Sequence, residues 1–173
     1  QHLRGQFAFA IWDGRREQLL LARDRFGEKP LYLCERDGSV YFASEIKALL
    51  RMPGVAPQVD VRAVWEYLAY RYVPGPKTLF AGIRKLPPAT YALWQFGRLK
   101  EFRYWAPPDK RIRKNSGDPS VEGFLGRLDE AVKLQMVSDV PFGAFLSGGH
   151  DSSTIVALMS RHNGSVKTFS VGF

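Results

Sequence analysis

Length, composition and charge already exclude several classes of protein. The chain has 173 residues, of which 45% are hydrophobic and 24% are charged, the balance of an ordinary globular protein. No apolar run approaches the ~18 residues that cross a bilayer, and no signal-peptide pattern opens the chain. Cys34 is the single cysteine, which excludes an internal disulfide and fits a reducing cytoplasm. We therefore expect a cytoplasmic protein without a membrane partner.

The net charge of +8 raises the question of nucleic-acid binding. Much of the excess lies in residues 98–117, where seven lysines and arginines stand against two acidic residues. This segment surrounds Pro107-Pro108 and is typical of a solvated connector, because a charge run is usually a solvated face. We therefore do not expect a nucleic acid as partner.

Residues 5–50 have the pattern of two β-hairpins and a short helix. Alternating or apolar runs predict strands at residues 7–12, 19–22, 31–34 and 40–43. Turns at Asp13-Gly14 and Asp37-Gly38 join them in pairs. Ser44 is the expected N-cap of a helix that ends near Leu50. Cys34 lies in mid-strand, where a buried and inert thiol is expected.

The loop between the hairpins, residues 23–30, carries charged residues and a glycine. Such loops often bind ligands, but the same composition is found in ordinary solvated turns, and spacing alone favours the turn. Further along, Asp60 is the expected N-cap of a second helix. Its stripe of Val61, Val64, Trp65 and Leu68 is predicted to be core. Strands are expected at residues 86–93 and 99–105, around a turn at Phe96-Gly97.

A domain boundary is predicted at residues 106–117, which are rich in proline, lysine and arginine and have no apolar period. Asp118, with Pro119 at the first helical position, is expected to open a third helix. We expect the core face of this helix to comprise Val121, Phe124, Leu125, Leu128 and Val132.

The most informative stretch begins with the apolar run 140–146 and continues as Ser147-Gly148-Gly149-His150-Asp151-Ser152-Ser153. A strand is expected before the glycines, a helix after them up to Asn163-Gly164, and a further strand at 166–173. Adjacent glycines let backbone N–H groups approach a ligand, and the first turn of a helix has unpaired N–H groups. Together they predict an anion-binding loop. Asp151 would repel phosphate unless a divalent cation bridges the two, which indicates Mg²⁺.

Glycines between a strand and a helix also occur in ordinary tight turns, so Gly-Gly alone decides nothing. The full string Ser-Gly-Gly-x-Asp-Ser-Ser is more specific. It is neither a Walker A motif nor the dinucleotide motif Gly-x-Gly-x-x-Gly. It looks like the pyrophosphate loop of enzymes that cleave ATP between its α and β phosphates.

Several stretches together resemble one family, the glutamine-hydrolysing asparagine synthetases. Besides residues 139–153, the matching strings lie at residues 5–10, 22–27, 29–32, 43–49, 86–88 and 168–173. The resemblance implies an α/β fold in two parts. Residues 1–105 would be the later, antiparallel layers of a type 2 glutamine amidotransferase domain of the N-terminal-nucleophile type. Residues 106–117 would be a linker, and residues 118–173 the first βαβ unit of a parallel-sheet domain of the adenine-nucleotide α-hydrolase type.

The resemblance also implies a mechanism of two half-reactions. One domain hydrolyses glutamine to ammonia through an N-terminal cysteine. The other adenylates the side-chain carboxylate of aspartate with ATP and Mg²⁺, and ammonia that arrives through a tunnel displaces AMP. Carried over, the ATP-binding residues would be Leu146, Ser147, Gly148, Gly149, Asp151, Ser152 and Val171. Asp151 would also bear on Mg²⁺, and Asp24 would pair with the α-ammonium group of glutamine.

Two departures from the family pattern matter. The nucleophilic cysteine would lie upstream of Gln1 and the aspartate-binding residues beyond Phe173, so we expect the chain alone to be a fragment that is inactive in both half-reactions. His150 stands where the family has an aliphatic residue. One interpretation is that His150 simply packs at the loop edge or faces solvent. The other is that its imidazole lies beside the phosphates and makes ATP affinity depend on pH.

Other interpretations stay open at this point. A β-lactam-forming synthetase, or another paralogue that amidates a different carboxylate, would resemble the chain in both parts. A non-catalytic ATP-binding regulatory protein would keep the same fold. A homodimer is a candidate assembly, and the sequence does not decide the oligomeric state.

Overall fold

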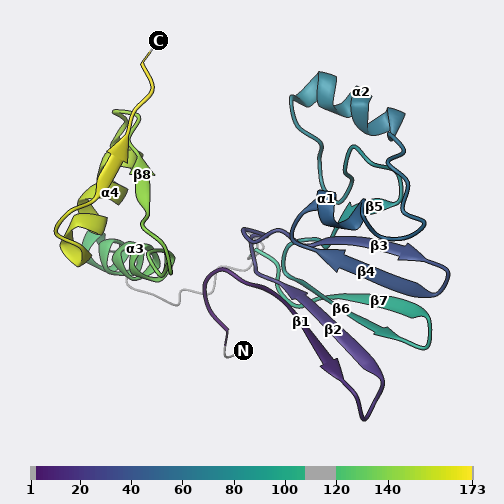
Figure 1. The fold of residues 1–173 in the computed structure, drawn as a ribbon. Helices are drawn as coiled ribbons and strands as arrows, with labels where there is room; N and C mark the ends of the chain where they lie inside the picture. The colour runs from purple at the N-terminus through teal and green to yellow at the C-terminus, as the bar shows by residue number, and fades with distance from the viewer. Residues whose placement is uncertain (1–2, 108–119, 173) are drawn as a thin grey trace. The chain divides into compact units, whose positions relative to one another are not determined.

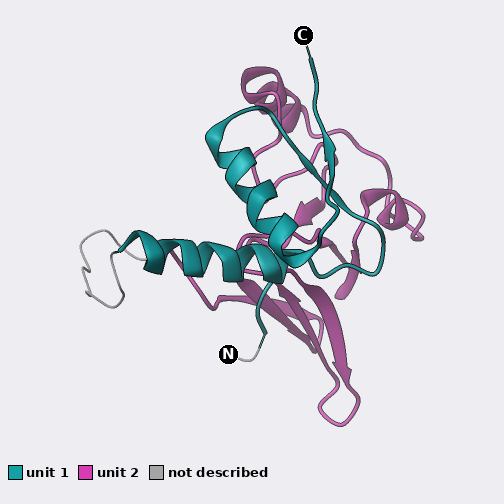
Figure 2. Ribbon diagram, turned by 90° about the vertical axis from the view of Figure 1, so that its left-hand side faces the viewer, with its two compact units in different colours: residues 1–5, 109–173 teal, residues 6–108 magenta. Residues whose placement is uncertain are grey.

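A computed structural model describes residues 3–107 and 120–172. The chain divides into two compact units, which Figure 2 colours separately: residues 6–108 form one, and residues 1–5 with 109–173 form the other. We describe each unit by itself. The predicted linker at 106–117 lies mostly outside the described residues.

The unit of residues 6–108 contains two antiparallel sheets (Figure 1). The four-stranded sheet has the order β1-β2-β6-β7, with β1 at Ala8–Asp13, β2 at Gln18–Arg23, β6 at Thr90–Gln95 and β7 at Arg98–Arg103. The three-stranded sheet has the order β4-β3-β5, with β3 at Tyr32–Arg36, β4 at Ser39–Ala43 and β5 at Ile83–Lys85. The expected antiparallel hairpins are confirmed, whereas β5 was not predicted.

The hairpin turns at Asp37-Gly38 and Phe96-Gly97 share one backbone conformation. Asp37 and Gly38 have φ of 48° and 73°, and Phe96 and Gly97 have φ of 49° and 73°. Two successive positive φ values define the type I′ turn, whose twist matches that of the paired strands. The positions of both turns are therefore confirmed.

The main core of this unit joins the two sheets. It contains Leu21, Leu31, Leu33, Leu86 and Ala92, which come from strands of both sheets and the segments beside them. A second cluster joins Cys34 and Ile83 to Leu49 of α1 (Ile46–Leu49). Cys34 is buried, as predicted, and this burial raises the pKa of its thiol, which keeps the thiol protonated and unreactive.

The caps of the helices in this unit follow the prediction in one case only. Asp60 caps α2 (Val61–Tyr70), since its side chain accepts the N–H groups of Arg62 and Ala63 at 2.9 and 3.3 Å. Ser44 does not cap α1. The N-cap residue is Glu45, and no side chain makes a capping hydrogen bond there.

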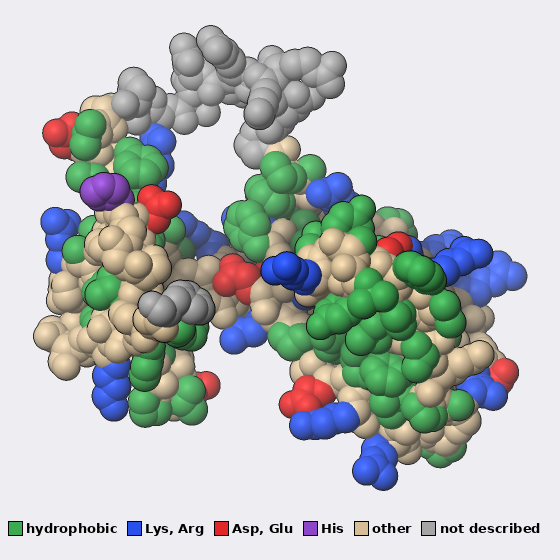
Figure 3. All heavy atoms as spheres, turned by 90° about the horizontal axis from the view of Figure 1, so that it is seen from above, with side chains coloured by type: hydrophobic (Ala, Val, Ile, Leu, Met, Phe, Trp, Pro, Cys, Tyr) green, Lys and Arg blue, Asp and Glu red, His purple; other side chains and the backbone are tan. Residues whose placement is uncertain are grey.

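The predicted core stripe of α2 is wrong. Val61, Trp65 and Leu68 are exposed and Val64 is half-buried, whereas Ala63 on another face is fully buried. Figure 3, seen from above Figure 1, shows hydrophobic side chains gathered on the face of this unit where α2 lies. Helical spacing shows which residues share a face, but it does not show what that face meets.

The second unit is built from α3 (Val121–Gln135), β8 (Gly143–Phe145), α4 (His150–His162) and β9 (Lys167–Phe169). Strands β8 and β9 pair in parallel, with Gly143 opposite Lys167 and Phe145 opposite Phe169. The strand–helix–strand order is as predicted. Both strands are shorter than the apolar runs 140–146 and 166–173 suggest.

Helix α3 begins later than predicted and packs through fewer residues. Its N-cap is Ser120, whose hydroxyl accepts the N–H of Gly123 at 3.0 Å, whereas Asp118 and Pro119 lie outside the described residues. Val132 packs with Leu158 and Met159 of α4, and Leu128 adds to this core. The predicted core positions Val121, Phe124 and Leu125 are exposed. No helix in the part of the chain that the structure describes is long and apolar enough to cross a membrane.

Candidate nucleotide-binding loop and its family

The loop between β8 and α4 starts from a fixed strand end. The N–H of Leu146 donates to the carbonyl of Phe169 on β9 at 2.8 Å, which extends the parallel pairing by one step. Gly148 has a φ of +80°, in the left-handed region where a side chain is strained. Gly149 is the N-cap of α4 and offers no side chain to cap the helix.

The N–H groups at the start of α4 therefore stay open. Within the described ranges, the backbone N–H groups of residues 148–152 donate no hydrogen bond. These groups also lie at the positive end of the helix dipole. Open N–H groups at a helix start fit the anion-binding loop that the sequence predicts, and anion binding itself stays a prediction.

Two hydroxyl groups complete the loop. The hydroxyl oxygens of Ser147 and Ser152 lie 3.1 Å apart, and Ser152 also lies 3.1 Å from the carbonyl oxygen of Gly149, to which its hydroxyl can donate. The predicted nucleotide residues Ser147, Gly148, Gly149 and Asp151 are exposed on this loop, and Leu146 and Ser152 are half-buried. Val171, two residues after the end of β9, is also exposed.

The structure gives His150 an exposed position at the first residue of α4. Its carbonyl accepts the hydroxyl of Thr154 at 2.8 Å. The interpretation that His150 faces solvent is confirmed, whereas a pH effect on ATP binding stays a prediction.

Asp24, the predicted glutamine ligand, lies in the other unit and is buried, with 1% of its surface exposed. Its Oδ1 accepts the N–H groups of Phe26 and Glu28 at 3.1 and 3.0 Å. Its Oδ2 accepts those of Lys29 and Phe7 at 2.9 and 3.4 Å. Burial alone would raise the pKa of this carboxyl group, but the four N–H donors together lower it below its ordinary value.

This geometry makes Asp24 an organiser of the loop at residues 23–30. Four donors occupy the lone-pair positions of a carboxylate, so an ammonium group finds no acceptor there unless the loop rearranges. The predicted pairing of Asp24 with the ammonium of glutamine therefore finds no support in the geometry.

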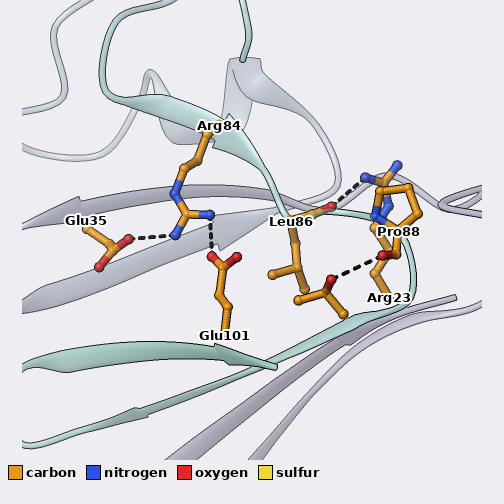
Figure 4. Close-up of polar contacts among 7 residues, drawn as sticks. Arg23, Glu35, Arg84, Leu86, Pro88 and Glu101 are labelled. Carbon is orange, nitrogen blue, oxygen red and sulfur yellow. Dashed lines mark hydrogen bonds and ion pairs between the residues drawn. The ribbon is translucent and has the colours of Figure 1, made fainter. Parts of the chain in front are cut away.

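Arg23 is a second organiser of the same loop, a role that was not predicted from the sequence. Its guanidinium donates to three carbonyl oxygens, those of Lys29 at 2.7 Å, Gly27 at 2.6 Å and Leu86 at 2.6 Å. Figure 4 shows the last of these contacts. The residue is buried, and this burial lowers the pKa of its guanidinium. No local signal in the sequence reveals such a role, because its partners include Leu86, which is distant in the chain.

Comparison with known proteins then decides the family. The model of the glutamine amidotransferase domain matches residues 1–105, and the model of asparagine synthase matches residues 123–173. The chain is 39% identical over 172 residues to asparagine synthetase (glutamine-hydrolyzing) 1 of Bacillus subtilis, which covers 99% of this chain and 27% of that protein.

The chain belongs to the family of glutamine-hydrolysing asparagine synthetases.

Two further relatives define the breadth of this resemblance. Asparagine synthetase (glutamine-hydrolyzing) 3 of Bacillus subtilis is 39% identical over 162 residues, which is 93% of this chain and 26% of the relative. Amidase chry2 of Gibberella zeae is 38% identical over 164 residues, which is 92% of this chain and 24% of the relative. The chain thus spans about a quarter of the length of each of these three relatives.

The described residues of this chain contain no group of three or more His, Cys, Asp or Glu side chains that could hold a metal ion such as Mg²⁺. Mg²⁺ is usually held by one or two carboxylates together with phosphate oxygens. The single exposed carboxylate of Asp151, in the first turn of α4, fits that pattern. When bound with ATP, Mg²⁺ would supply positive charge beside the phosphates.

Proposed function

We propose that the protein amidates the side-chain carboxylate of aspartate to form asparagine, with ATP as activator and glutamine as the source of ammonia. In this proposal residues 1–105 belong to a type 2 glutamine amidotransferase domain and residues 106–117 are the linker. Residues 118–173 begin an ATP-pyrophosphatase domain of the adenine-nucleotide α-hydrolase type. The reaction passes through an acyl-adenylate and releases AMP and pyrophosphate. The cytoplasm is the proposed location.

One observation carries the proposal: open N–H groups at the start of α4, next to a left-handed Gly148, in a chain of this family. The N–H groups of residues 148–152 would bind the two phosphates that leave as pyrophosphate. When the nucleotide binds, the hydroxyls of Ser147 and Ser152 would turn from each other and from the carbonyl of Gly149 to donate to the same oxygens. Because these donors are fixed before the reaction, they stabilise the negative charge that grows on pyrophosphate as it departs.

Other residues of the loop would hold the nucleotide in place. Leu146 and Val171, at the ends of neighbouring parallel strands, would lie on either side of the adenosine. Asp151 would hold Mg²⁺ against the phosphates. We leave Asp24 out of the proposal as a glutamine ligand, because its carboxylate already accepts four N–H groups.

A second candidate differs only in the acceptor. A relative of nearly equal identity is named an amidase rather than an asparagine synthetase. A different carboxylate could therefore replace aspartate, with the loop of residues 146–152 used in the same way, as in a β-lactam-forming synthetase or another amidotransferase. A regulatory protein that binds ATP without turnover is the remaining alternative.

The experiment incubates the intact protein with ATP, Mg²⁺, glutamine and aspartate, and measures asparagine, AMP and pyrophosphate. Equal amounts of the three products support the main proposal. Pyrophosphate with another carboxylate, and none with aspartate, favours the second candidate. ATP binding without pyrophosphate release from any carboxylate favours the regulatory alternative.

A further inference from the structure

Ser170, immediately after β9, makes a contact that the proposed function does not yet use. Its hydroxyl donates to the carbonyl oxygen of Leu146 at 2.6 Å. The N–H of the same Leu146 donates to the carbonyl of Phe169 at 2.8 Å. The end of β9 therefore fixes both backbone polar groups of the residue that precedes the loop.

This contact also controls the first N–H group of the loop. The peptide bond between Leu146 and Ser147 is planar and trans, so its C=O and N–H point in opposite directions. When the hydroxyl of Ser170 holds the carbonyl toward β9, it directs the N–H of Ser147 away from β9. The hydroxyl of Ser147, in turn, lies 3.1 Å from that of Ser152.

The contact adds little to the fold itself. The two strands already pair at three positions, and the hydrogen bond of Leu146 to Phe169 extends that pairing. Ser170 is exposed, so water would satisfy the carbonyl of Leu146 if the hydroxyl were removed. The orientation of the peptide, rather than the stability of the sheet, is what the hydroxyl determines.

We propose that Ser170 is a positioning residue for nucleotide binding, which holds the Leu146–Ser147 peptide in the orientation that the ATP-binding loop requires. The inference rests on the proposed function, because it assumes that this loop binds ATP. Ser170 acts through Leu146 and need not touch the nucleotide.

The test compares three variants of the intact protein with the wild type. Ser170→Ala removes the hydroxyl, and Ser170→Thr keeps it. Ser160→Ala is the matched control, because the hydroxyl of Ser160 also donates to a backbone carbonyl, that of Ala157 at 2.8 Å, but within α4 and away from the loop. The measurements are the Kd of ATP, the KM of ATP, kcat and Tm.

We expect Ser170→Ala to raise the Kd and KM of ATP about 5- to 10-fold, which corresponds to one hydrogen bond. Its kcat should change less than about 2-fold and its Tm should stay that of the wild type, because only ground-state positioning is lost. Ser170→Thr should restore the affinity, and Ser160→Ala should leave it unchanged.

Three outcomes would overturn the inference: wild-type affinity in Ser170→Ala, an equal loss in Ser160→Ala, or no recovery in Ser170→Thr. Each leaves the proposed function intact if Gly148→Ala still weakens ATP binding. A wild type that binds no ATP would overturn both the inference and the proposed function.

Discussion

The hydroxyl oxygens of Ser147 and Ser152 lie 3.1 Å apart, one before and one after the glycines that join β8 to α4. This hydrogen bond links the end of the strand to the first turn of the helix. The loop is therefore shaped by its own residues before any nucleotide arrives. A preorganised site of this kind binds more tightly because less conformational entropy is lost on binding.

This link predicts an energetic coupling between the two serines. Ser147→Ala and Ser152→Ala should each raise the Kd of ATP about 5- to 10-fold, because each removes a hydroxyl donor. The loss of ATP-binding free energy in the double variant should be smaller than the sum of the two single losses by about 0.5–1 kcal/mol, because the shared hydrogen bond is lost only once. Isothermal titration of the four proteins measures this, and strictly additive losses would show that the hydroxyls act independently.

Gly148 should be sensitive to substitution because of its backbone conformation. A Cβ there meets no atom within 4 Å, but the φ of +80° is strained for alanine by about 1 kcal/mol. Gly148→Ala should therefore weaken ATP binding at least about 5-fold through a change in the loop. Gly164→Ala is the control, because its added Cβ also meets no atom and its φ lies outside the left-handed region. Equal affinities of the two variants would contradict the assignment.

Gly143 should be required for the pairing of β8 with β9. An added Cβ would lie 2.6 Å from the carbonyl oxygen of Lys167 and 2.8 Å from the ring of Phe169, so the strands would have to separate. We expect Gly143→Ala to lower the free energy of unfolding by about 1–3 kcal/mol. Gly126→Ala within α3 meets no atom and should raise it by about 0.5–1 kcal/mol. Denaturant unfolding measures both changes in the free energy of unfolding, which we expect to have opposite signs.

The stability of the protein and its dependence on pH distinguish a structural role of Asp24 from a role as a glutamine ligand. Its pKa lies below the value in the unfolded chain, so the ionised carboxylate stabilises the fold above about pH 4. This contribution should disappear as the pH falls through the folded-state pKa. In Asp24→Asn an amide NH₂ would face backbone N–H donors, and at neutral pH we expect a loss of about 2–3 kcal/mol.

Thermal unfolding from pH 7 to pH 2 measures both effects. Asp37→Asn is the control, because that side chain is 88% exposed, and it should change stability by less than about 0.5 kcal/mol. If Asp24→Asn kept the wild-type Tm and raised only the KM of glutamine, Asp24 would be a substrate ligand after all.

Arg84 joins the two sheets of the first unit and should contribute modestly to its stability. It pairs with Glu35 on β3 at 2.7 Å and with Glu101 on β7, as Figure 4 shows. Because all three side chains are partly exposed, Arg84→Gln should cost about 1 kcal/mol, and the cost should shrink in ~1 M salt. Arg36→Gln, whose partner Asp37 is exposed, should cost less. Equal costs for both variants would mean that the bridge between sheets adds nothing.

The local features of this chain were predictable from the sequence, because their causes lie within a few residues. Asp60 caps α2 through its own near neighbours, and the Asp37-Gly38 turn follows from residues that tolerate positive φ. The glycine loop between β8 and α4 was predicted for the same reason. Features that depend on distant partners were not. Trp65 lies on an exposed face although its spacing is that of a core residue. Asp24 is buried, and one of the four N–H groups that it accepts comes from Phe7, outside its own loop.

The ends of elements were also predicted less well than the elements themselves. Ser44 and Asp118 have the chemistry of N-caps, but Glu45 and Ser120 occupy those positions. Strand β5, only three residues long, has no period that a sequence pattern can detect.

The most direct test of the account is a crystal structure of the intact protein with Mg²⁺ and an ATP analogue that carries a methylene group between the α and β phosphates. If this loop binds the phosphates that leave as pyrophosphate, the β and γ phosphate oxygens should lie about 3 Å from the backbone N–H groups of residues 148–152. Phosphates bound elsewhere, with those N–H groups in contact with other atoms of the protein, would contradict it.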